Sequence, residues 1–588
     1  MKRRMSWTVL AAAGLAACGA TIQPAELVIV NARVQTMSDA RPTAQALAIR
    51  AGRIVRVGDD AQVRAMVGPA TRVIDAGGAT VLPGFIDTHM HPVTSSAQLD
   101  DCSAGDKELR VADLAALLVA CQATRDPVAG LDWLLVSDLN PAGFKASRQD
   151  LDAIEAARPV LLKATDGHSS WLNSRALAAA GITRATPDVA DGRIVRDASG
   201  DPTGHLIDGA QRLADGAVPA DTLEAKVAAL RKALPMLHAA GLTSVMDASV
   251  AEAELEVLAS LARSGELTLD VTTALEAEAD GKVDSLPKLE DQRQRYAGLH
   301  NLRVDTAKVF VDGVMEFPTQ SAALLEPYTP VEGQGRSDTG NLYVDPEAFG
   351  RLATELDRRG FNVHAHAIGD RAVRVALDAF AQARGSLGEA SRAKFSISHL
   401  QLVDPADWPR FAELEVYASF QLLWAQPDNY ATDAVQPFIG PMRSAMMYPA
   451  RSLLGNGATL VGGSDWNVSS PAPLEAIAVA MDRRDPEQPE KPPLVPMQSV
   501  ALDVMLRAYT IEAARMLGID GETGALAEGK QADVIVLDRN LDGADATAVR
   551  AAAVRYTFAD GKQVHGTPDG ADHRATGATP ASRLHVAG

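Results

Sequence analysis

The chain has 588 residues, which exceeds one ordinary domain but suits an α/β barrel with an attached domain. Hydrophobic residues make up 47% of it, a normal share for an enzyme with a large core. The 75 acidic residues outnumber the 56 basic ones, giving a formal net charge of −19. This charge argues against nucleic acid as a partner, because neutralising phosphates requires clustered Lys and Arg.

A targeting segment is predicted for residues 1–18. A basic start at 2–4 precedes an apolar stretch over 6–17 that is too short to span a bilayer. The stretch closes with Leu-Ala-Ala-Cys, which resembles a bacterial lipobox. The resemblance implies cleavage before Cys18, a lipid on that cysteine, and an exported protein that faces the periplasm and touches the membrane through this lipid alone. A plain cleaved signal peptide and an ordinary N-terminal helix are the alternatives.

Two further cysteines, Cys102 and Cys121, remain. An oxidising compartment would permit a disulfide between them. Two buried free thiols fit the sequence equally well, because disulfide formation depends on a distance that the sequence does not give.

Both ends of the chain contain short strand-like runs separated by turn signals. Apolar runs and Gly-containing turns alternate through residues 26–82, and the segment 520–566 repeats the pattern. We therefore expect one composite β-sandwich domain built from both segments. The tail at 567–588, with its Gly, Ala, Thr and Pro, is predicted to be disordered.

Between these ends, strand-like runs alternate with helical patterns. A helical segment over 346–359, for example, ends at Gly360 and leads into an apolar strand at 362–366. Repeated alternation implies a parallel sheet, whose commonest large form is the (β/α)8 barrel. The expected fold class is α/β, with a TIM barrel over residues 83–519 and an insertion at about 93–300.

The stretch VLPGFIDTHMHP at residues 81–92 presents two histidines at the end of a buried strand. On a strand, residues two apart point to the same face, so the imidazoles of His89 and His91 would be presented together. Such a pair supplies half of a metal site. The alternative is a pair of surface histidines in a turn.

Four more apolar strands end in residues that can bind a metal: Lys308, His366, His399 and Asp465. Each alone is a weak signal, because a lone histidine there is more often a hydrogen-bonded core residue and a lone Asp often caps a helix. The carboxyl ends of barrel strands share one rim, so together these positions predict a metal centre.

These blocks resemble the amidohydrolase superfamily, in particular the branch that contains N-substituted formamide deformylase. The similarity runs from about residue 26 to 565. Its motifs are PGFIDTHMHP, DGHSSWLNS at 166–174, the strand of Lys308 with Asp312-Gly313, HAIGDRA at 366–372, SHLQLV at 398–403 and GSDWNVSSP at 463–471.

The resemblance implies one or two divalent ions, zinc or a similar metal, with these ligands: His89, His91 and Asp465 for one ion, His366 and His399 for the second, and Lys308 bridging both. Lys308 would do so as a carbamate, because an ammonium offers no lone pair to a cation. A structural ion pair of Lys308, for example with Asp312, is the alternative, and it would favour a single-metal site.

The implied mechanism is attack of metal-activated water on a carbonyl carbon. Asp465 would act as general base and then as general acid. We expect His168 to hold or polarise the substrate carbonyl; alternatively, it caps a helix that starts near Ser169. Trp424 is a candidate for the pocket lining, although core packing explains it equally well. His364 shares the strand face of His366, and we rank it lower because the block after His366 matches the family.

The sequence also departs from the family pattern. Glu316 lies in a block where relatives usually carry an Arg-Thr pair, and Ser398 stands where many carry Glu. We predict a metal-dependent hydrolase that cleaves a non-peptide C–N bond in a small amide, formamide or imide. The alternatives are a deaminase, lactonase or esterase on the same scaffold, or an inactive surface binding lipoprotein. The expected partner is a small-molecule substrate, and a homodimer is left open.

Overall fold

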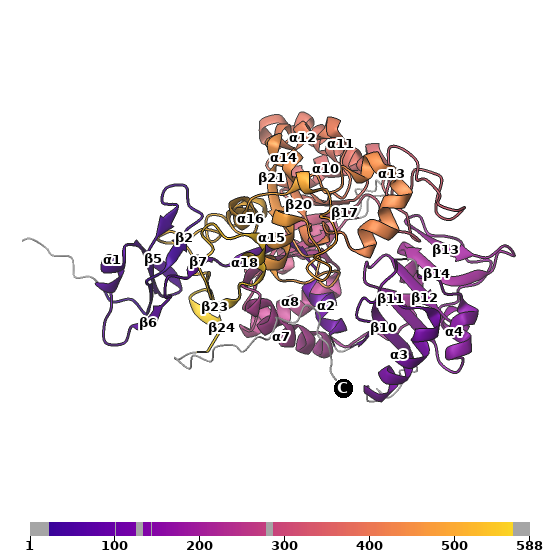
Figure 1. The fold of residues 1–588 in the computed structure, drawn as a ribbon, viewed down its shortest axis with the longest axis horizontal. Helices are drawn as coiled ribbons and strands as arrows, with labels where there is room; N and C mark the ends of the chain where they lie inside the picture. The colour runs from indigo at the N-terminus through magenta and orange to yellow at the C-terminus, as the bar shows by residue number, and fades with distance from the viewer. Residues whose placement is uncertain (1–22, 100, 125–132, 143, 278–285, 568–588) are drawn as a thin grey trace, which may run out of the picture.

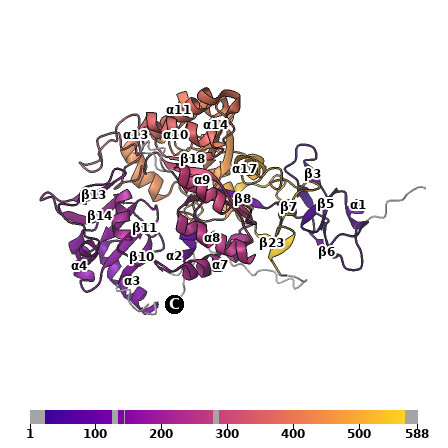
Figure 2. The same cartoon turned by 180° about the vertical axis from the view of Figure 1, so that it is seen from behind.

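The computed structural model describes residues 23–99, 101–124, 133–142, 144–277 and 286–567. The predicted signal segment with Cys18, and nearly all of the predicted tail, lie outside these residues. Within the described part, no helix is both long and apolar enough to cross a membrane. Three lobes follow one another along the longest axis, with a barrel in the middle (Figures 1 and 2).

The central lobe is a nearly closed barrel of eight parallel strands in the order β21-β20-β19-β18-β17-β16-β15-β8. In chain order these are β8 (Phe85–Met90), β15 (Leu242–Val250), β16 (Asp270–Glu276), β17 (Leu302–Phe310), β18 (Asn362–Ala367), β19 (Phe395–His399), β20 (Val416–Phe420) and β21 (Thr459–Gly462). The first and last strands meet where the Thr88 hydroxyl donates to the Gly462 carbonyl at 3.0 Å. The predicted (β/α)8 barrel is confirmed.

The helices that cover the barrel are α7 (Leu223–Ala239), α8 (Glu252–Ser264), α9 (Leu286–Arg295), α10 (Pro346–Arg358), α11 (Asp370–Leu387), α12 (Trp408–Glu413), α13 (Gln436–Ser444), α14 (Ala450–Gly455), α15 (Pro473–Asp482), α16 (Leu502–Ala508) and α17 (Ile511–Leu517). Helix α10 shows why they form where they do. The Asp345 side chain caps it by accepting from the Ala348 N–H, and Pro346 occupies the first turn. Its buried Phe349 and Leu352 then belong to the main hydrophobic core.

Both ends of the chain build the lobe at the left of Figure 1. One sheet has the order β5-β4-β1-β6 and the other β24-β23-β22-β7-β2-β3. Their strands are β1 (Leu27–Val30), β2 (Arg33–Gln35), β3 (Thr43–Ala44), β4 (Ala46–Arg50), β5 (Arg53–Gly58), β6 (Arg72–Asp75), β7 (Thr80–Pro83), β22 (Val534–Leu537), β23 (Val554–Ala559) and β24 (Lys562–His565). The two ends join where Val81 of β7 pairs with Val536 of β22. A shared core that includes Ile29, Val534 and Phe558 confirms a composite sandwich.

A separate six-stranded sheet forms the lobe on the other side of the barrel (Figures 1 and 2). It contains β9 (Cys102–Ser103), β10 (Leu134–Leu139), β11 (Val160–Ala164), β12 (Ser169–Leu172), β13 (Gly192–Arg196) and β14 (Pro202–Asp208), with helices α3 (Val111–Thr124), α4 (Arg148–Ile154) and α5 (Ser174–Ala179). We call this sheet with its helices the inserted lobe. It leaves the barrel after α2 (Pro92–Gln98) and is shorter than the insertion expected over 93–300, because β15 and β16 pair within the barrel.

The segment after His168 differs from expectation. A helix starting near Ser169 was one explanation for His168, but residues 169–172 form strand β12, in which Ser170 pairs with Lys163. Helix α5 begins only at Ser174, where the side chain of Asn173 caps it. His168 therefore precedes a strand and does not cap a helix.

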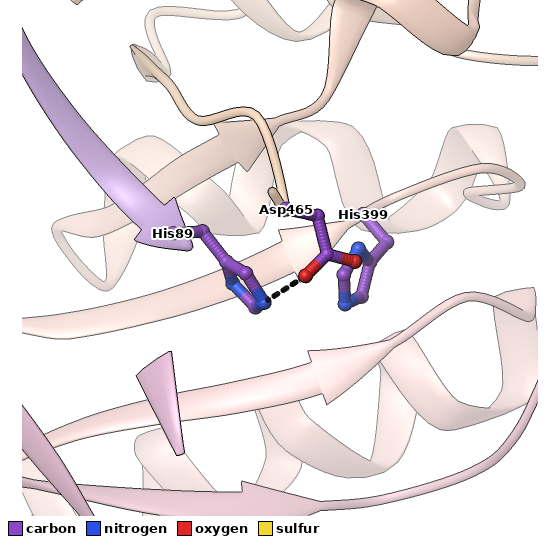
Figure 3. A group of neighbouring side chains, drawn as sticks. All are labelled: His89, His399 and Asp465. Carbon is purple, nitrogen blue, oxygen red and sulfur yellow. Dashed lines mark ion pairs between the residues drawn. The ribbon is translucent and has the colours of Figure 1, made fainter. Parts of the chain in front are cut away.

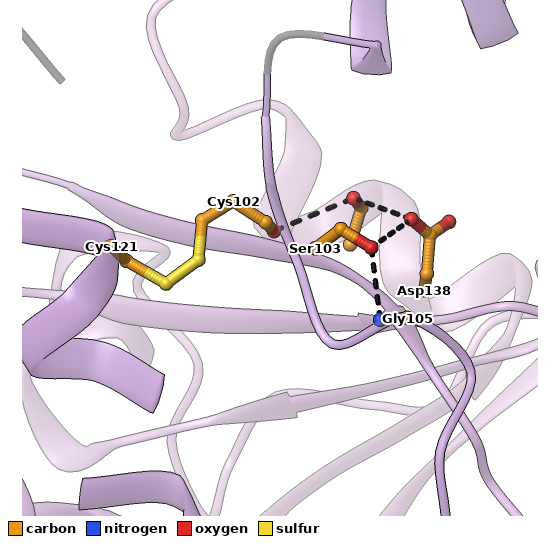
Figure 4. Close-up of a disulfide and its surroundings, with 6 residues drawn as sticks. Cys102, Ser103, Gly105, Cys121 and Asp138 are labelled. Atoms are coloured by element: carbon orange, nitrogen blue, oxygen red, sulfur yellow. Dashed lines mark hydrogen bonds between the residues drawn. A yellow bond between two sulfur atoms is a disulfide. The ribbon is translucent and has the colours of Figure 1, made fainter. Parts of the chain in front are cut away.

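A disulfide joins Cys102 of β9 to Cys121 of α3, with their Cα atoms 5.4 Å apart (Figure 4). The sequence left open whether these two cysteines form a disulfide or remain free thiols, and the structure has the disulfide. The bond ties the edge strand of the inserted sheet to its covering helix. Next to it, the Ser103 hydroxyl donates to Asp138 at 2.5 Å, so the turn that follows β9 is held on both sides.

Candidate metal centre

Each candidate ligand lies at the carboxyl end of a barrel strand. His89 is on β8 with His91 just after it, Lys308 is on β17, His366 is on β18, His399 ends β19, and Asp465 follows β21. The buried Asp87 holds the first and last of these strands in place. Its carboxylate accepts from the backbone N–H of His89 at 2.9 Å and of Ser464 at 3.0 Å. The N–H of Asp465 in turn donates to the His89 carbonyl at 2.7 Å.

His89, His399 and Asp465 form the centre of the site (Figure 3). Each offers one ligand atom, and these three atoms lie within 4.8 Å of one another. Asp465 Oδ1 lies 3.3 Å from His89 Nε2 and 3.0 Å from His91 Nε2. The backbone of His399 (φ 76°) and of Asp465 (φ 55°) is left-handed, a strained conformation that is common at functional sites.

The residues fit a divalent cation. Among the described residues, the buried His399 Nδ1 has no hydrogen-bond partner. Asp465 Oδ1, in turn, lies within ion-pair distance of two imidazole nitrogens, those of His89 and His91. Buried polar atoms are normally paired, so a partnerless imidazole nitrogen beside this carboxylate suits a metal ion. Imidazole and carboxylate donors of this kind match zinc and similar ions.

Burial favours the neutral form of His89 and His399, which metal binding requires. Burial, reinforced by the nearby Lys308, lowers the pKa of His89 to about 3. Burial also holds the pKa of His399 well below its usual range, with His366 and His89 adding to the effect. Burial alone would raise the pKa of Asp465. The charges and hydrogen bonds of His89 and His91 lower it by more, so the pKa lies well below the usual range.

His366 lies beside His399, with ring centroids 4.5 Å apart, and a buried carboxylate orients it. Its Nδ1 is 3.2 Å from Asp312 Oδ1, which leaves Nε2 for a ligand. Asp312 also accepts from the backbone N–H groups of Ile368 at 3.0 Å and Gly369 at 2.9 Å. Asp312 is thus engaged with the strand of His366 rather than with Lys308.

Lys308 is 1% exposed in the barrel interior. Burial lowers the pKa of its amine to about 8, although Asp465 and Glu276 act in the opposite direction. Its Nζ lies 4.8 Å from the centroid of the Phe310 ring. The lowered pKa raises the share of unprotonated amine, which carbamate formation needs because only the unprotonated nitrogen is a nucleophile.

His364 lies two residues before His366 on β18, level with Lys308 of β17. One of its ring nitrogens is 2.7 Å from His89 Nδ1 and the other is 2.7 Å from Ser396 Oγ. It therefore fixes the ring of His89 with Nε2 towards Asp465. The two-residue spacing predicts that His364 and His366 share one face of the strand. How far each side chain lies from the barrel rim is set by the register of the neighbouring strands.

A cavity of about 2400 Å³ lies between the barrel rim and the inserted lobe, and all six candidate ligands contribute to its lining. His168 lines the opposite wall, with its ring centroid 5.5 Å from that of His366. Burial alone would lower the pKa of His168, but the hydrogen bond and charge of Asp208 raise it to about 9. Trp424 also lines the cavity, with its ring stacked on His399 at 5.4 Å.

The two departures from the family pattern differ in their relation to the cavity. Glu316 lines it and accepts from Gln401 Nε2 at 2.9 Å. Ser398 is buried, and its hydroxyl donates to the Ala365 carbonyl at 3.1 Å. Of the two, only Glu316 is therefore placed to contact a substrate.

A parallel barrel with histidines and an aspartate grouped at its carboxyl rim has the architecture of a metal-dependent enzyme. The model of the amidohydrolase family matches residues 72–565, and the chain belongs to this family. It is 30% identical to the protein LONG AFTER FAR-RED 3 of Arabidopsis thaliana, over 92% of each chain. It is 26% identical to the N-substituted formamide deformylase of Arthrobacter pascens, over 92% of this chain and 98% of that one.

The fold is also similar to that of an uncharacterised metal-dependent hydrolase from Pyrococcus horikoshii. The TM-score is 0.68 at 24% identity, and the similarity covers 88% of this chain and 98% of the other. This likeness supports the fold, and the family membership agrees with the resemblance found in the sequence motifs.

Proposed function

We propose that this protein hydrolyses the C–N bond of a small amide, formamide or imide with the help of one or two divalent ions, of which zinc is the first candidate. The observation that carries the proposal is the grouping of His89, His399 and Asp465 at the barrel rim, where one ligand atom of each lies within 4.8 Å of the others. The bond type is suggested by the name of the relative from Arthrobacter pascens, a formamide deformylase.

A divalent ion held by these residues would lower the pKa of water to about 7 and polarise a carbonyl group. Asp465 is then the base that takes the proton from the attacking water and passes it to the leaving nitrogen, because its carboxylate is buried at the centre of the site. His168 faces the site from the inserted lobe, and its raised pKa of about 9 favours the protonated ring, which would donate a hydrogen bond to the carbonyl oxygen of the substrate.

Lys308 would join the site as a carbamate. Its unprotonated Nζ forms a bond to the carbon of carbon dioxide and loses a proton, which gives a carbamate whose single negative charge is shared by two oxygens on a long side chain. The buried position and lowered pKa of the amine support this modification. A mass increase of one carbon dioxide on Lys308 in the native protein, lost on acidification, is the signature to seek.

The test combines metal analysis of the purified protein with a screen of small N-formyl and N-acyl amines and cyclic imides. His89→Ala and Asp465→Asn are expected to lower turnover by at least 10³-fold, because they remove a ligand and the proposed base. His300→Ala serves as the control, since His300 is exposed and lies beside Asp560. Near-normal turnover by either site variant would contradict the assigned roles. Bound metal without turnover would favour the inactive binding protein.

A further inference from the structure

A network of three side chains joins the inserted lobe to the barrel beside the metal centre. His168 Nδ1 lies 2.5 Å from Asp208 Oδ1, and both residues belong to the inserted lobe. The hydroxyl of Tyr343, which precedes α10 of the barrel, donates to the other oxygen of the same carboxylate. Asp208 is 8% exposed, so this carboxylate is removed from solvent and committed to two partners.

The backbone around the network is built to hold it. Asp208 has φ 51° at the end of β14, and its N–H donates to the His168 carbonyl at 2.9 Å. Non-glycine residues adopt this conformation at a cost, and such strain concentrates at functional sites. Asp208 is thus bound to His168 through both its backbone and its side chain.

Gly313 leaves room for the network on the barrel side. A Cβ at this position would lie 2.0 Å from Ser321 Oγ, 2.7 Å from the Tyr343 hydroxyl oxygen and 2.9 Å from Asp208 Oδ1, closer than such atoms approach in proteins. Gly313 directly follows Asp312, whose carboxylate orients His366. One short segment after β17 therefore supplies the carboxylate behind His366 and leaves space for the carboxylate behind His168.

We propose that Asp208 and Tyr343 are positioning residues that fix the ring of His168, with Nε2 towards the carbonyl oxygen of the bound substrate. This inference rests on the proposed function. Engagement of Nδ1 by Asp208 makes Nε2 the ring nitrogen available to the cavity, and the 5.5 Å between the rings of His168 and His366 places it at the metal centre. The inserted lobe then supplies part of the active site, and substrate is held between two separately anchored walls.

The central variant is Asp208→Asn in the metal-loaded protein, assayed with the N-formyl or N-acyl amine found in the screen. An asparagine can present either its oxygen or its nitrogen to the ring, so His168 loses its fixed orientation. We expect kcat to fall about 10²-fold with little change in KM, in line with the usual contribution of a positioned proton donor. Tyr343→Phe keeps the contact of Asp208 with His168 and is expected to reduce kcat by less, about tenfold.

A double variant separates positioning from a general structural effect. If Asp208 acts through His168, then Asp208→Asn has no further effect in a His168→Gln background. Asp201→Asn is the matched control, because Asp201 pairs with Arg184 in the same lobe and lies outside the cavity lining. Multiplicative effects of the two substitutions, or an unchanged kcat in Asp208→Asn, would overturn the proposal.

A second measurement does not depend on turnover. A short N–H to carboxylate hydrogen bond shifts the proton resonance strongly downfield, so the wild type should show one such signal that both Asp208→Asn and His168→Gln abolish. If the signal is present but no amide is cleaved, the positioning holds and the proposed function fails. If amides are cleaved but the signal is absent, the positioning fails and the proposed function holds.

Discussion

At the scale of single residues, burial sets the charge of histidines that have no part in the metal centre. His205 is stacked on Trp171, with ring centroids 4.4 Å apart, and burial with the nearby Arg193 lowers its pKa to about 3. An unfolded chain binds a proton at this residue below pH 6.5, whereas the folded chain does not. His205 therefore contributes stability that is fully present above pH 6.5 and is lost as the pH falls towards 3.

We predict that His205→Phe makes stability less sensitive to acid. Phenylalanine keeps the stacking partner of Trp171 and cannot bind a proton. Between pH 6.5 and 5, the wild type should lose about 2 kcal/mol through this group, and the variant should lack that loss. Urea unfolding at the two pH values measures the difference, with the exposed His300→Gln as control. An equal loss in wild type and His205→Phe would show that His205 is protonated in the folded protein.

The sequence predicted which residues end the barrel strands but not how deep their side chains lie. The two-residue spacing of His89 and His91 was sufficient to place both rings at the rim. The sequence alone suggests Lys308 as a partner of Asp312. In the structure Asp312 contacts His366, because the parallel register of β17 and β18 pairs Phe310 with His366. No local sequence pattern encodes that register.

At the scale of elements, the disulfide stabilises the inserted lobe and through it one wall of the cavity. Cys102 and Cys121 are 19 residues apart, and closing a loop of this length restricts the unfolded chain. Replacing both cysteines by serine should lower the stability of this lobe by about 3 kcal/mol. Proteolysis followed by mass analysis should then find cleavage within residues 101–208 first. A reducing agent should have no further effect on the double variant, and equal protection of both proteins would contradict the prediction.

The alternation of strands and helices was predictable because barrel strands are apolar runs bounded by glycine turns and capped helices. The inserted lobe was harder to delimit. Residues 169–172 contain Ser-Ser-Trp-Leu, a short apolar pattern that fits either a strand or the start of a helix, and pairing with β11 and β14 decides for a strand. The last strand of the inserted lobe, β14, ends at Asp208, and its assignment to this lobe also depends on its pairing with β12.

At the scale of the whole molecule, the metal centre lies where the barrel closes. His89 of β8 and Asp465 after β21 come from the two strands that meet at this seam, and His399 lies two strands away. A metal ion that binds them links the first and last strands of the barrel. Because it binds the folded state, it stabilises the fold by about 2.7 kcal/mol at a concentration 100 times its Kd.

Chelation should therefore lower the melting temperature of the barrel as well as abolish turnover, and added zinc should restore both. Differential scanning calorimetry of chelated and reloaded protein measures the shift. The His89→Ala variant is the control, since its melting temperature should respond much less to zinc. An equal response in the wild type and His89→Ala would place the metal elsewhere.

The pairing of β7 with β22 has a consequence for how the molecule is made. Val81 leaves the ribosome long before its partner Val536. Until then β7 keeps an open edge, with backbone groups ready to pair with any neighbouring chain. Truncation near the C-terminus would leave that edge permanently uncovered, so loss of the final strands threatens solubility although no ligand of the catalytic rim is removed.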